Sequence, residues 1–157
     1  MASIDLRAAF DLVPRRFLWL RLKNIGVPYH LLDSMIDLHT NNYAQVQWGQ
    51  QGELTNKVII DRGVRQGCVL APTLFSLFIN DIATFLLNCQ HDCPFIAGIP
   101  SPIFLFADDS LLLSLTASGL QNLINTFCSY LDMSGLEINT SKTKCLTFRA
   151  RRGKVYH

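Results

Sequence analysis

The N-terminal third of the chain combines one strand-like segment with two helical patterns. SIDL (Ser3–Leu6) begins as a strand does. After Pro14, the segment RRFLWLRLKNI (15–25) spaces its apolar residues as a short helix that ends at Gly26, and Pro28 opens a second helix. This part of the sequence therefore predicts one strand followed by two helices.

The middle of the chain predicts two strands, a loop and a long helix. Tyr43–Trp48 alternates as a half-buried strand does, and GQQGE (49–53) is its turn to the apolar strand KVIID (57–61). The glycine-marked loop RGVRQGC (62–68) leads into the apolar segment Val69–Asn88. These residues predict a unit of strand, loop and helix.

The segment Val69–Asn88 also approaches membrane-spanning length. Asn80 and Asp81 lie near its middle, and threonine and serine residues interrupt its apolar run. A buried core helix explains this pattern better than a membrane span. We predict no transmembrane segment and no membrane partner.

The last third predicts a hairpin, a helix and a strand. IFLFADDSLLL (103–113) places two carboxylates between apolar arms that we expect to be buried. A helix over Ser118–Met133, capped by Ser118, ends at Gly135 before a final strand CLTFR (145–149). The order of elements indicates an α+β fold, an antiparallel sheet with helices packed on one face, of the split βαβ, ferredoxin-like kind.

The length and composition of the chain fit a single domain with a sizeable hydrophobic core. It has 157 residues, of which 49% are hydrophobic and 17% charged, and its formal net charge is +2. A net charge this close to zero does not by itself indicate a nucleic-acid-binding protein. We divide the chain into residues 1–148 and a basic tail, 149–157, which we interpret as solvated in preference to a phosphate contact.

Five cysteines and no legible signal peptide predict reduced thiols in an intracellular protein, with nucleus or cytoplasm left open. Cys89, His91 and Cys93 suggest zinc as an alternative. The cluster lacks the second ligand pair and the usual spacing of a zinc site, so zinc is the weaker interpretation.

The adjacent Asp108 and Asp109 raise a chemical question, because two neighbouring carboxylates repel one another. Carboxylates are typical ligands of Mg²⁺, and a third, Asp5 in the first strand, is the best candidate to complete a site that bridges phosphates. The alternative is that the Asp-Asp pair merely forms a hairpin turn.

Four segments together resemble the palm motifs of reverse transcriptases, most of all those of the non-LTR, LINE-type retrotransposon branch. Each segment is a weak signal alone, but their order and spacing across nearly the whole chain make a chance match improbable. They are DLRAAFD (Asp5–Asp11), RGVRQGCVLAPTLF (Arg62–Phe75), FADD (Phe106–Asp109) and GLEINTSKTKCLTF (Gly135–Phe148).

The resemblance implies a polymerase palm that carries out RNA-directed DNA synthesis. It implies that Asp5, Asp108 and Asp109 hold two Mg²⁺ ions, or alternatively Mn²⁺, which activate a primer 3′-hydroxyl and stabilise the departing pyrophosphate. It also implies that Lys142 donates a proton near the pyrophosphate, whereas the residue alone suggests a solvated lysine.

The resemblance also implies three substrate-binding residues. Phe10 matches the aromatic position under the incoming sugar that excludes a 2′-hydroxyl, although a core role explains it equally. Gln66 and Gly67 match the palm loop that lies against nucleotide and template, where glycine permits close approach. Gln66 looks buried, and Asp11 is expected to be a structural acid pointing away from Phe10 in an extended stretch.

The chain also departs from the family pattern. Arg65 stands where relatives often have proline, and Cys68 where they usually have serine. Fingers and thumb have no counterpart, so we expect weak or no activity alone and, as partners, an RNA template, a DNA primer, dNTPs and segments that supply fingers and thumb. The alternative is a non-catalytic retroelement remnant or interaction module.

Overall fold

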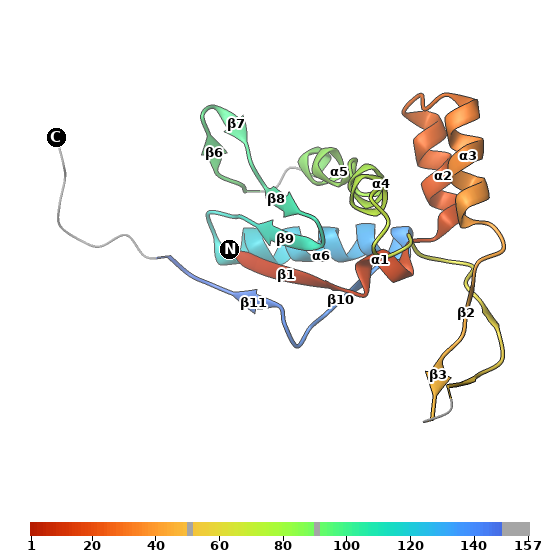
Figure 1. Ribbon diagram of the computed structural model, residues 1–157. Helices are drawn as coiled ribbons and strands as arrows, with labels where there is room; N and C mark the ends of the chain where they lie inside the picture. Colours follow the sequence, from red (N-terminus) through yellow and green to blue (C-terminus); the bar gives the residue numbers. More distant parts are fainter. Residues whose placement is uncertain (50–51, 90–91, 149–157) are drawn as a thin grey trace.

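One antiparallel sheet organises the protein (Figure 1). The computed structural model describes residues 1–49, 52–89 and 92–148. In spatial order the strands are β10 (Glu137–Ile138), β1 (Ala2–Arg7), β9 (Asp109–Leu112) and β8 (Ile103–Phe106), and β11 (Lys144–Cys145) pairs with the other end of β1. The first strand of the chain therefore lies inside the sheet.

The connections between these strands have the split βαβ pattern. Along the chain the order is β1, β8, β9 and β10, whereas in the sheet β9 separates β1 from β8 and β10 lies on the other side of β1. Helices connect β1 to β8 and β9 to β10. This is the ferredoxin-like arrangement, so the predicted fold class is confirmed.

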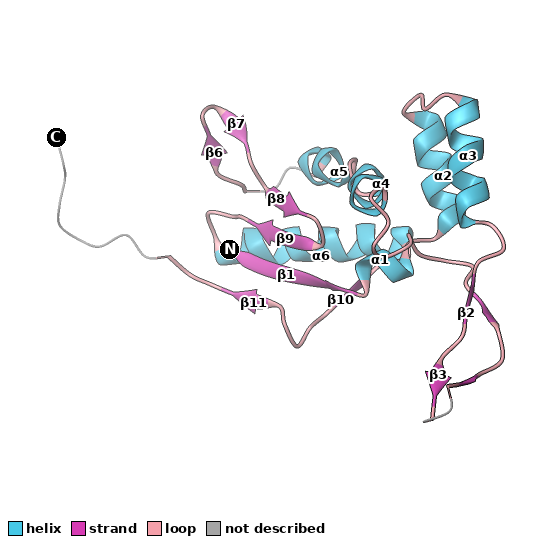
Figure 2. Ribbon diagram, viewed as in Figure 1, coloured by secondary structure: helices cyan, strands magenta, loops and turns pink. Residues whose placement is uncertain are grey.

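Six helices lie among the described residues (Figure 2). The two helices expected after the first strand are present as α2 and α3, and the C-terminal helix is the longest. Their bounds are α1 Ala9–Leu12, α2 Arg15–Asn24, α3 Tyr29–His39, α4 Ala71–Phe78, α5 Ile82–Asn88 and α6 Ala117–Ser134.

Helices cover one face of the sheet. Successive strand residues point to opposite faces, and in β1 the residues Ala2, Ile4 and Leu6 are buried. They share the core with Phe127 of α6 and Phe75 of α4. The intervening residues of β1 are polar, and they point to the face that these helices leave uncovered.

The ends of α6 are held by two local features. Thr116 is the N-cap, because its hydroxyl accepts a hydrogen bond of 3.0 Å from the backbone N–H of Gly119. Ser118 was the predicted cap, and this was wrong because the helix already begins at Ala117. Gly135 ends the helix with a φ of 69°, as predicted.

The long apolar segment forms two helices, α4 and α5, instead of the single helix that was predicted. The chain leaves the helical path at residues 79–81. Asp81 there accepts a hydrogen bond from the hydroxyl of Tyr130 and lies 3.1 Å from the guanidinium of Arg21. Residues Ala71–Asn88 are long and apolar enough to cross a membrane by length and composition alone, but their buried side chains belong to the common core.

Arg21 joins α2 to the helices around it. Its guanidinium donates to the carbonyl of Phe78, to the hydroxyl of Tyr130 at 2.7 Å and to the hydroxyl of Ser134 at 3.2 Å. Burial and the Asp81 carboxylate raise the pKa of Tyr130 above its ordinary value. A polar network thus connects α2, α6 and the break between α4 and α5.

A two-stranded arm projects from the end of α3 (Figure 1). The predicted strand Tyr43–Trp48 is divided in two, and all four residues assigned to its strands are exposed, so a half-buried strand was wrong. The arm lacks a covering layer among the described residues. Its strands are β2 (Tyr43–Ala44) paired with β5 (Val58–Ile59), and β3 (Gln47–Trp48) paired with β4 (Glu53–Leu54).

The hairpin of β8 and β9 is present as predicted, but its first arm is not buried. Phe104, Leu105 and Phe106 are exposed, and β8 is an edge strand of the sheet. A second small hairpin precedes it, β6 (Phe95–Ile96) with β7 (Ile99–Pro100). The final strand is shorter than CLTFR, and the predicted basic tail, 149–157, lies outside the described residues.

Candidate functional site

Asp5 and Asp109 are directly opposite each other on neighbouring strands. In the antiparallel register of β1 and β9, Asp5 pairs with Asp109 and Ile4 with the buried Ser110. Residues in direct register share a face, with Cβ atoms roughly 4.5–5.5 Å apart. The two carboxylates therefore meet on the uncovered face, where like charges destabilise the sheet unless a cation compensates them.

Asp108 lies in the two-residue turn that joins β8 to β9. Its neighbour Ala107 has a φ of 52°, a left-handed conformation that is uncommon for a residue with a Cβ. Asp108 is half-buried and Asp109 is exposed. Within residues 1–49, 52–89 and 92–148, no three His, Cys, Asp or Glu side chains are grouped closely enough to hold a metal ion.

The donor chemistry of this site nevertheless fits Mg²⁺. This ion is usually bound by one or two carboxylates together with substrate phosphates and water, and it does not require a cage made only of protein ligands. Asp5 and Asp109 supply two carboxylates from adjacent strands. Asp108 precedes Asp109 in the turn between β8 and β9, and the assignment of all three as ligands stays a prediction.

Lys142 is the cation that accompanies these acids. Its ammonium group lies 3.6 Å from a carboxylate oxygen of Asp5. The side chain of Asp5 is 24% exposed and that of Lys142 is 67% exposed. Lys142 therefore lies beside one of the predicted metal ligands, while its role as a proton donor near the pyrophosphate stays a prediction.

Phe10 lies in the short helix α1, which follows β1. It is half-buried, and its ring centroid is 4.8 Å from that of Phe75. This packing supports the core role, and its place beneath a sugar stays a prediction. Asp11 was expected to point away from Phe10 in an extended stretch, which is wrong because both residues are helical.

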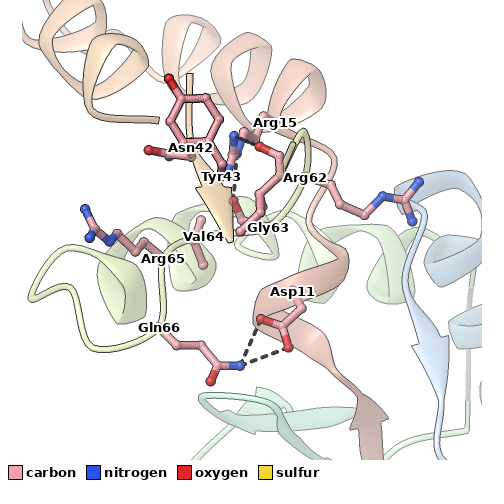
Figure 3. A pocket seen from close by; sticks show the side chains of 10 residues that line it. Asp11, Arg15, Asn42, Tyr43, Arg62, Gly63, Val64, Arg65 and Gln66 are labelled. Carbon is pink, nitrogen blue, oxygen red and sulfur yellow. Dashed lines mark hydrogen bonds between the residues drawn. The ribbon is translucent and has the colours of Figure 1, made fainter. Parts of the chain in front are cut away.

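Gln66 contacts Asp11 across the loop that precedes α4. Its side-chain amide donates to both carboxylate oxygens of Asp11 at 2.9 Å (Figure 3). Gln66 is exposed, so the expectation of a buried glutamine was wrong. These two residues stand at one side of a cleft of about 460 Å³, whose other lining residues include Arg15, Tyr43, Arg62 and Arg65.

Two glycines shape the loop that carries Gln66. Gly63 is buried with a φ of 82°, and a Cβ placed on it would lie 2.7 Å from the carbonyl oxygen of Asp11. Gly67 has a similar φ of 80°, but a Cβ there would meet nothing within 4 Å. Gly63 therefore allows close packing of the loop against α1, and Gly67 leaves open space beside it.

Two residues that position this site were missed by the sequence analysis. Arg15 donates from Nε to the carbonyl of Gly63 at 2.9 Å, and from Nη1 to the carbonyls of His39 and Ile60. Burial lowers the pKa of Arg15, while Asp61 opposes this shift. A lone arginine in a helical pattern carries no signal of such distant partners.

Asn139 is the second missed residue. Its backbone N–H donates to the carbonyl of Asp5 at 2.8 Å, and its own carbonyl accepts from the N–H groups of Lys142 and Thr143. Asparagine followed by threonine and serine, NTS, is a turn signal that could have identified this position.

The zinc alternative is not supported by the side chains that can be placed. Cys93 is buried and Cys89 is exposed, and His91 lies outside the described residues.

Comparisons of sequence identify the family. The profile described as reverse transcriptase (RNA-dependent DNA polymerase) matches residues 1–154. The chain is 28% identical over 154 residues to the Retrovirus-related Pol polyprotein from type-1 retrotransposable element R2 of Popillia japonica, covering 98% of this chain and 25% of that protein. It is 28% identical over 160 residues to the RNA-directed DNA polymerase from mobile element jockey of Drosophila melanogaster, covering 97% of this chain and 16% of that protein.

Solved structures agree on the fold. Apo telomerase from Candida tropicalis, truncated from the C-terminal domain, has a TM-score of 0.67 at 14% identity, covering 97% of this chain and 31% of that one. Telomerase from Candida albicans, in complex with a fragment of telomeric RNA, has a TM-score of 0.60 at 17% identity, covering 93% and 27%. At these identities the likeness shows the fold alone, and it agrees with a polymerase palm.

This chain spans a quarter or less of the length of the R2 and jockey relatives. The family profile covers nearly the whole chain, and both relatives come from non-LTR retrotransposons, so the predicted resemblance is confirmed. The chain belongs to the reverse transcriptase family, in the non-LTR retrotransposon branch.

Proposed function

We propose that this chain is the palm of an RNA-directed DNA polymerase, which transfers a nucleotide from a dNTP to the 3′-hydroxyl of a primer. The observation that carries this proposal is the register of β1 and β9, which sets Asp5 directly opposite Asp109 on the uncovered face. Such a like-charge pair has little structural value, so it points to the binding of a cation.

The acids and the lysine divide the chemistry between them. Asp5, Asp108 and Asp109 would hold two Mg²⁺ ions, or Mn²⁺, which activate the primer hydroxyl and neutralise charge on the leaving pyrophosphate. Lys142, whose ammonium group lies 3.6 Å from Asp5, would donate a proton to the leaving pyrophosphate. β1 and β9 fix Asp5 and Asp109, so these two carboxylates need little reorganisation for catalysis.

The loop and the short helix bind the substrate in this proposal. Phe10 presents one edge to the sugar of the incoming nucleotide while its ring packs on Phe75. Gln66 exchanges its hydrogen bonds to Asp11 for contacts with nucleotide and template, since its amide is exposed. Gly67 has open space beside it, which allows a substrate to approach the backbone.

The partners are an RNA template, a DNA primer and dNTPs. The relatives named Pol polyprotein and RNA-directed DNA polymerase are several times longer than this chain. We propose that fingers and thumb come from further segments, and that the chain alone extends primers weakly. The exposed arm formed by β2–β5 is consistent with surfaces that such segments cover.

Primer extension tests the proposal. The purified chain is supplied with an RNA template, a DNA primer, dNTPs and Mg²⁺, then with Mn²⁺, beside the double variant Asp108→Asn/Asp109→Asn. A matched control, Asp33→Asn/Asp37→Asn, removes the same charge from α3. We expect weak extension that only the first variant abolishes.

One result would overturn this proposal, and another would restrict the activity to a polymerase that includes fingers and thumb. Extension that survives in Asp108→Asn/Asp109→Asn would assign the activity to another source. No extension by the folded wild-type chain with either metal would show that this chain has no polymerase activity of its own.

A second function, a non-catalytic module, is favoured by one observation. No three potential ligands are grouped for a metal within the part of the chain that the structure describes. If this function is correct, Mg²⁺ leaves the unfolding midpoint unchanged, and replacing the aspartates with asparagine raises stability by relieving repulsion.

A further inference from the structure

The Asp5 carboxylate already has a cation beside it. Among ion pairs of the described residues, the partner of Asp5 is Lys142, at 3.6 Å. The nearest basic residue along the strand, Arg7, is paired with Glu137 at 3.4 Å. The ammonium group of Lys142 therefore lies next to the carboxylate that the proposed function assigns to a metal.

The loop that carries Lys142 is tied to Asp5 through the backbone. The Asn139 N–H donates to the Asp5 carbonyl at 2.8 Å. The start of this loop is therefore fixed to Asp5, the residue whose carboxylate Lys142 contacts. The Asn139 carbonyl then accepts from the N–H groups of Lys142 and Thr143 at 3.2 and 3.0 Å. The Ser141 hydroxyl donates to the Asn139 side chain at 2.7 Å. These bonds close the turn and bring Lys142 back over Asp5.

Charge explains why the ammonium group stays there. Asp5 and Asp109 are opposed in register, and a cation beside Asp5 offsets part of their repulsion. Lys142 is 67% exposed on a long flexible stem, so it can leave the carboxylate without disturbing the core. An ion pair as exposed as this one is weak, so a cation of higher charge can displace the lysine from Asp5.

We propose that Lys142 is a displaceable counter-ion of Asp5, which competes with the divalent cation for this carboxylate. Binding of the metal releases the ammonium group from Asp5 while the Asn139 turn keeps it at the edge of the site. The cationic side chain thus becomes free only when the metal is in place. This inference rests on the proposed function, because it requires a divalent cation at Asp5.

The test is a Mn²⁺ titration of the full chain, read from the paramagnetic resonance signal of free Mn²⁺. Lys142→Met should tighten Mn²⁺ binding about two- to five-fold, which is the factor that an exposed ion pair can supply. Lys142→Arg keeps the positive charge and should bind Mn²⁺ no more tightly than the wild type.

Lys144→Met is the matched control. Lys144 is also exposed and pairs in register with Ser3, which lies on the same face of β1 as Asp5, but it forms no ion pair with the described acids. The Lys144→Met substitution removes the same charge from the same face of the sheet, so it should change the Mn²⁺ affinity by less than about 1.5-fold.

A second measurement follows Lys142 itself. In NMR spectra of the protein labelled with ¹³C-lysine, the Cε resonance assigned to Lys142 should shift as Mg²⁺ is added. The midpoint of this shift should equal that of metal binding. The Lys144 resonance should not shift. This readout does not depend on enzymatic activity.

The outcomes separate this inference from the proposed function. Equal tightening in Lys142→Met and Lys144→Met would overturn the competition and leave the metal site intact. Unchanged affinity in Lys142→Met would overturn it in the same way. Absence of Mn²⁺ binding in the wild type and every variant would overturn the inference and the proposed metal site together.

Discussion

Replacing Gly63 with alanine should damage the loop that carries Gln66 more than the same change at Gly67. Both glycines have a positive φ, 82° and 80°, so alanine meets the same conformational penalty at each position, about 1–2 kcal/mol. The two positions differ in the space around them. Comparing Gly63→Ala with Gly67→Ala therefore isolates the effect of close packing.

At Gly63 the added Cβ would lie 2.7 Å from the carbonyl oxygen and 2.9 Å from the Cα of Asp11. Both are backbone atoms, which cannot rotate away as a side chain can. The loop is also held by the Gly63 N–H, which donates to Val13, and by the Gly63 carbonyl, which accepts from Arg15. Overpacking of this kind costs about 1–3 kcal/mol.

The sum for Gly63→Ala is a loss of about 2–5 kcal/mol in the free energy of unfolding, against about 1–2 kcal/mol for Gly67→Ala. Urea denaturation of both variants and the wild type, with the m-values compared, measures this difference. Losses equal within about 0.5 kcal/mol would refute the tight contact between the loop and α1.

Tyr130→Phe should lower the free energy of unfolding by about 1.5–3 kcal/mol, because the hydroxyl bonds to two charged groups, Asp81 and Arg21. Since the pKa of Tyr130 is raised, the native state keeps the proton above roughly pH 10, where the unfolded state loses it. Wild-type stability should therefore fall above that pH, by up to about 1.4 kcal/mol per pH unit more than in Tyr130→Phe, as urea titrations from pH 8 to 11 can measure. Thr116→Ala should cost about 1 kcal/mol through loss of the N-cap, and Ser118→Ala much less. Similar urea midpoints for the last two variants would contradict the assignment of the cap.

Local patterns predicted the elements of the fold well where a single face is buried. The strand at Ser3–Leu6, the helices α2, α3 and α6, and the helix end at Gly135 all appear in the structure as expected. Elements outside the core were predicted less well. The predicted strand Tyr43–Trp48 and the β8 residues Phe104–Phe106 have exposed apolar side chains, because no other described element covers them.

The break at residues 79–81 shows a different limit. The segment around it is apolar enough for one helix, and sequence periodicity continues across it. The conformation is decided by partners that are remote along the chain, because Asp81 meets Arg21 and Tyr130 from two other helices. Such pairings are invisible to a local window.

The sequence by itself determined the family. Four motifs in order indicated a reverse transcriptase palm, and this resemblance predicts that Asp5, Asp108 and Asp109 hold divalent cations. These conclusions depend on which residues are present and in which order. Both are properties of the chain before it folds.

Only the tertiary structure decided which charges meet. The register of β1 with β9 sets Asp5 against Asp109, and the Asn139 turn brings Lys142 to within 3.6 Å of Asp5. More than a hundred positions separate Asp5 from each of these partners along the chain. Their proximity depends on strand pairing and on backbone hydrogen bonds, which form only when the sheet assembles over its helices.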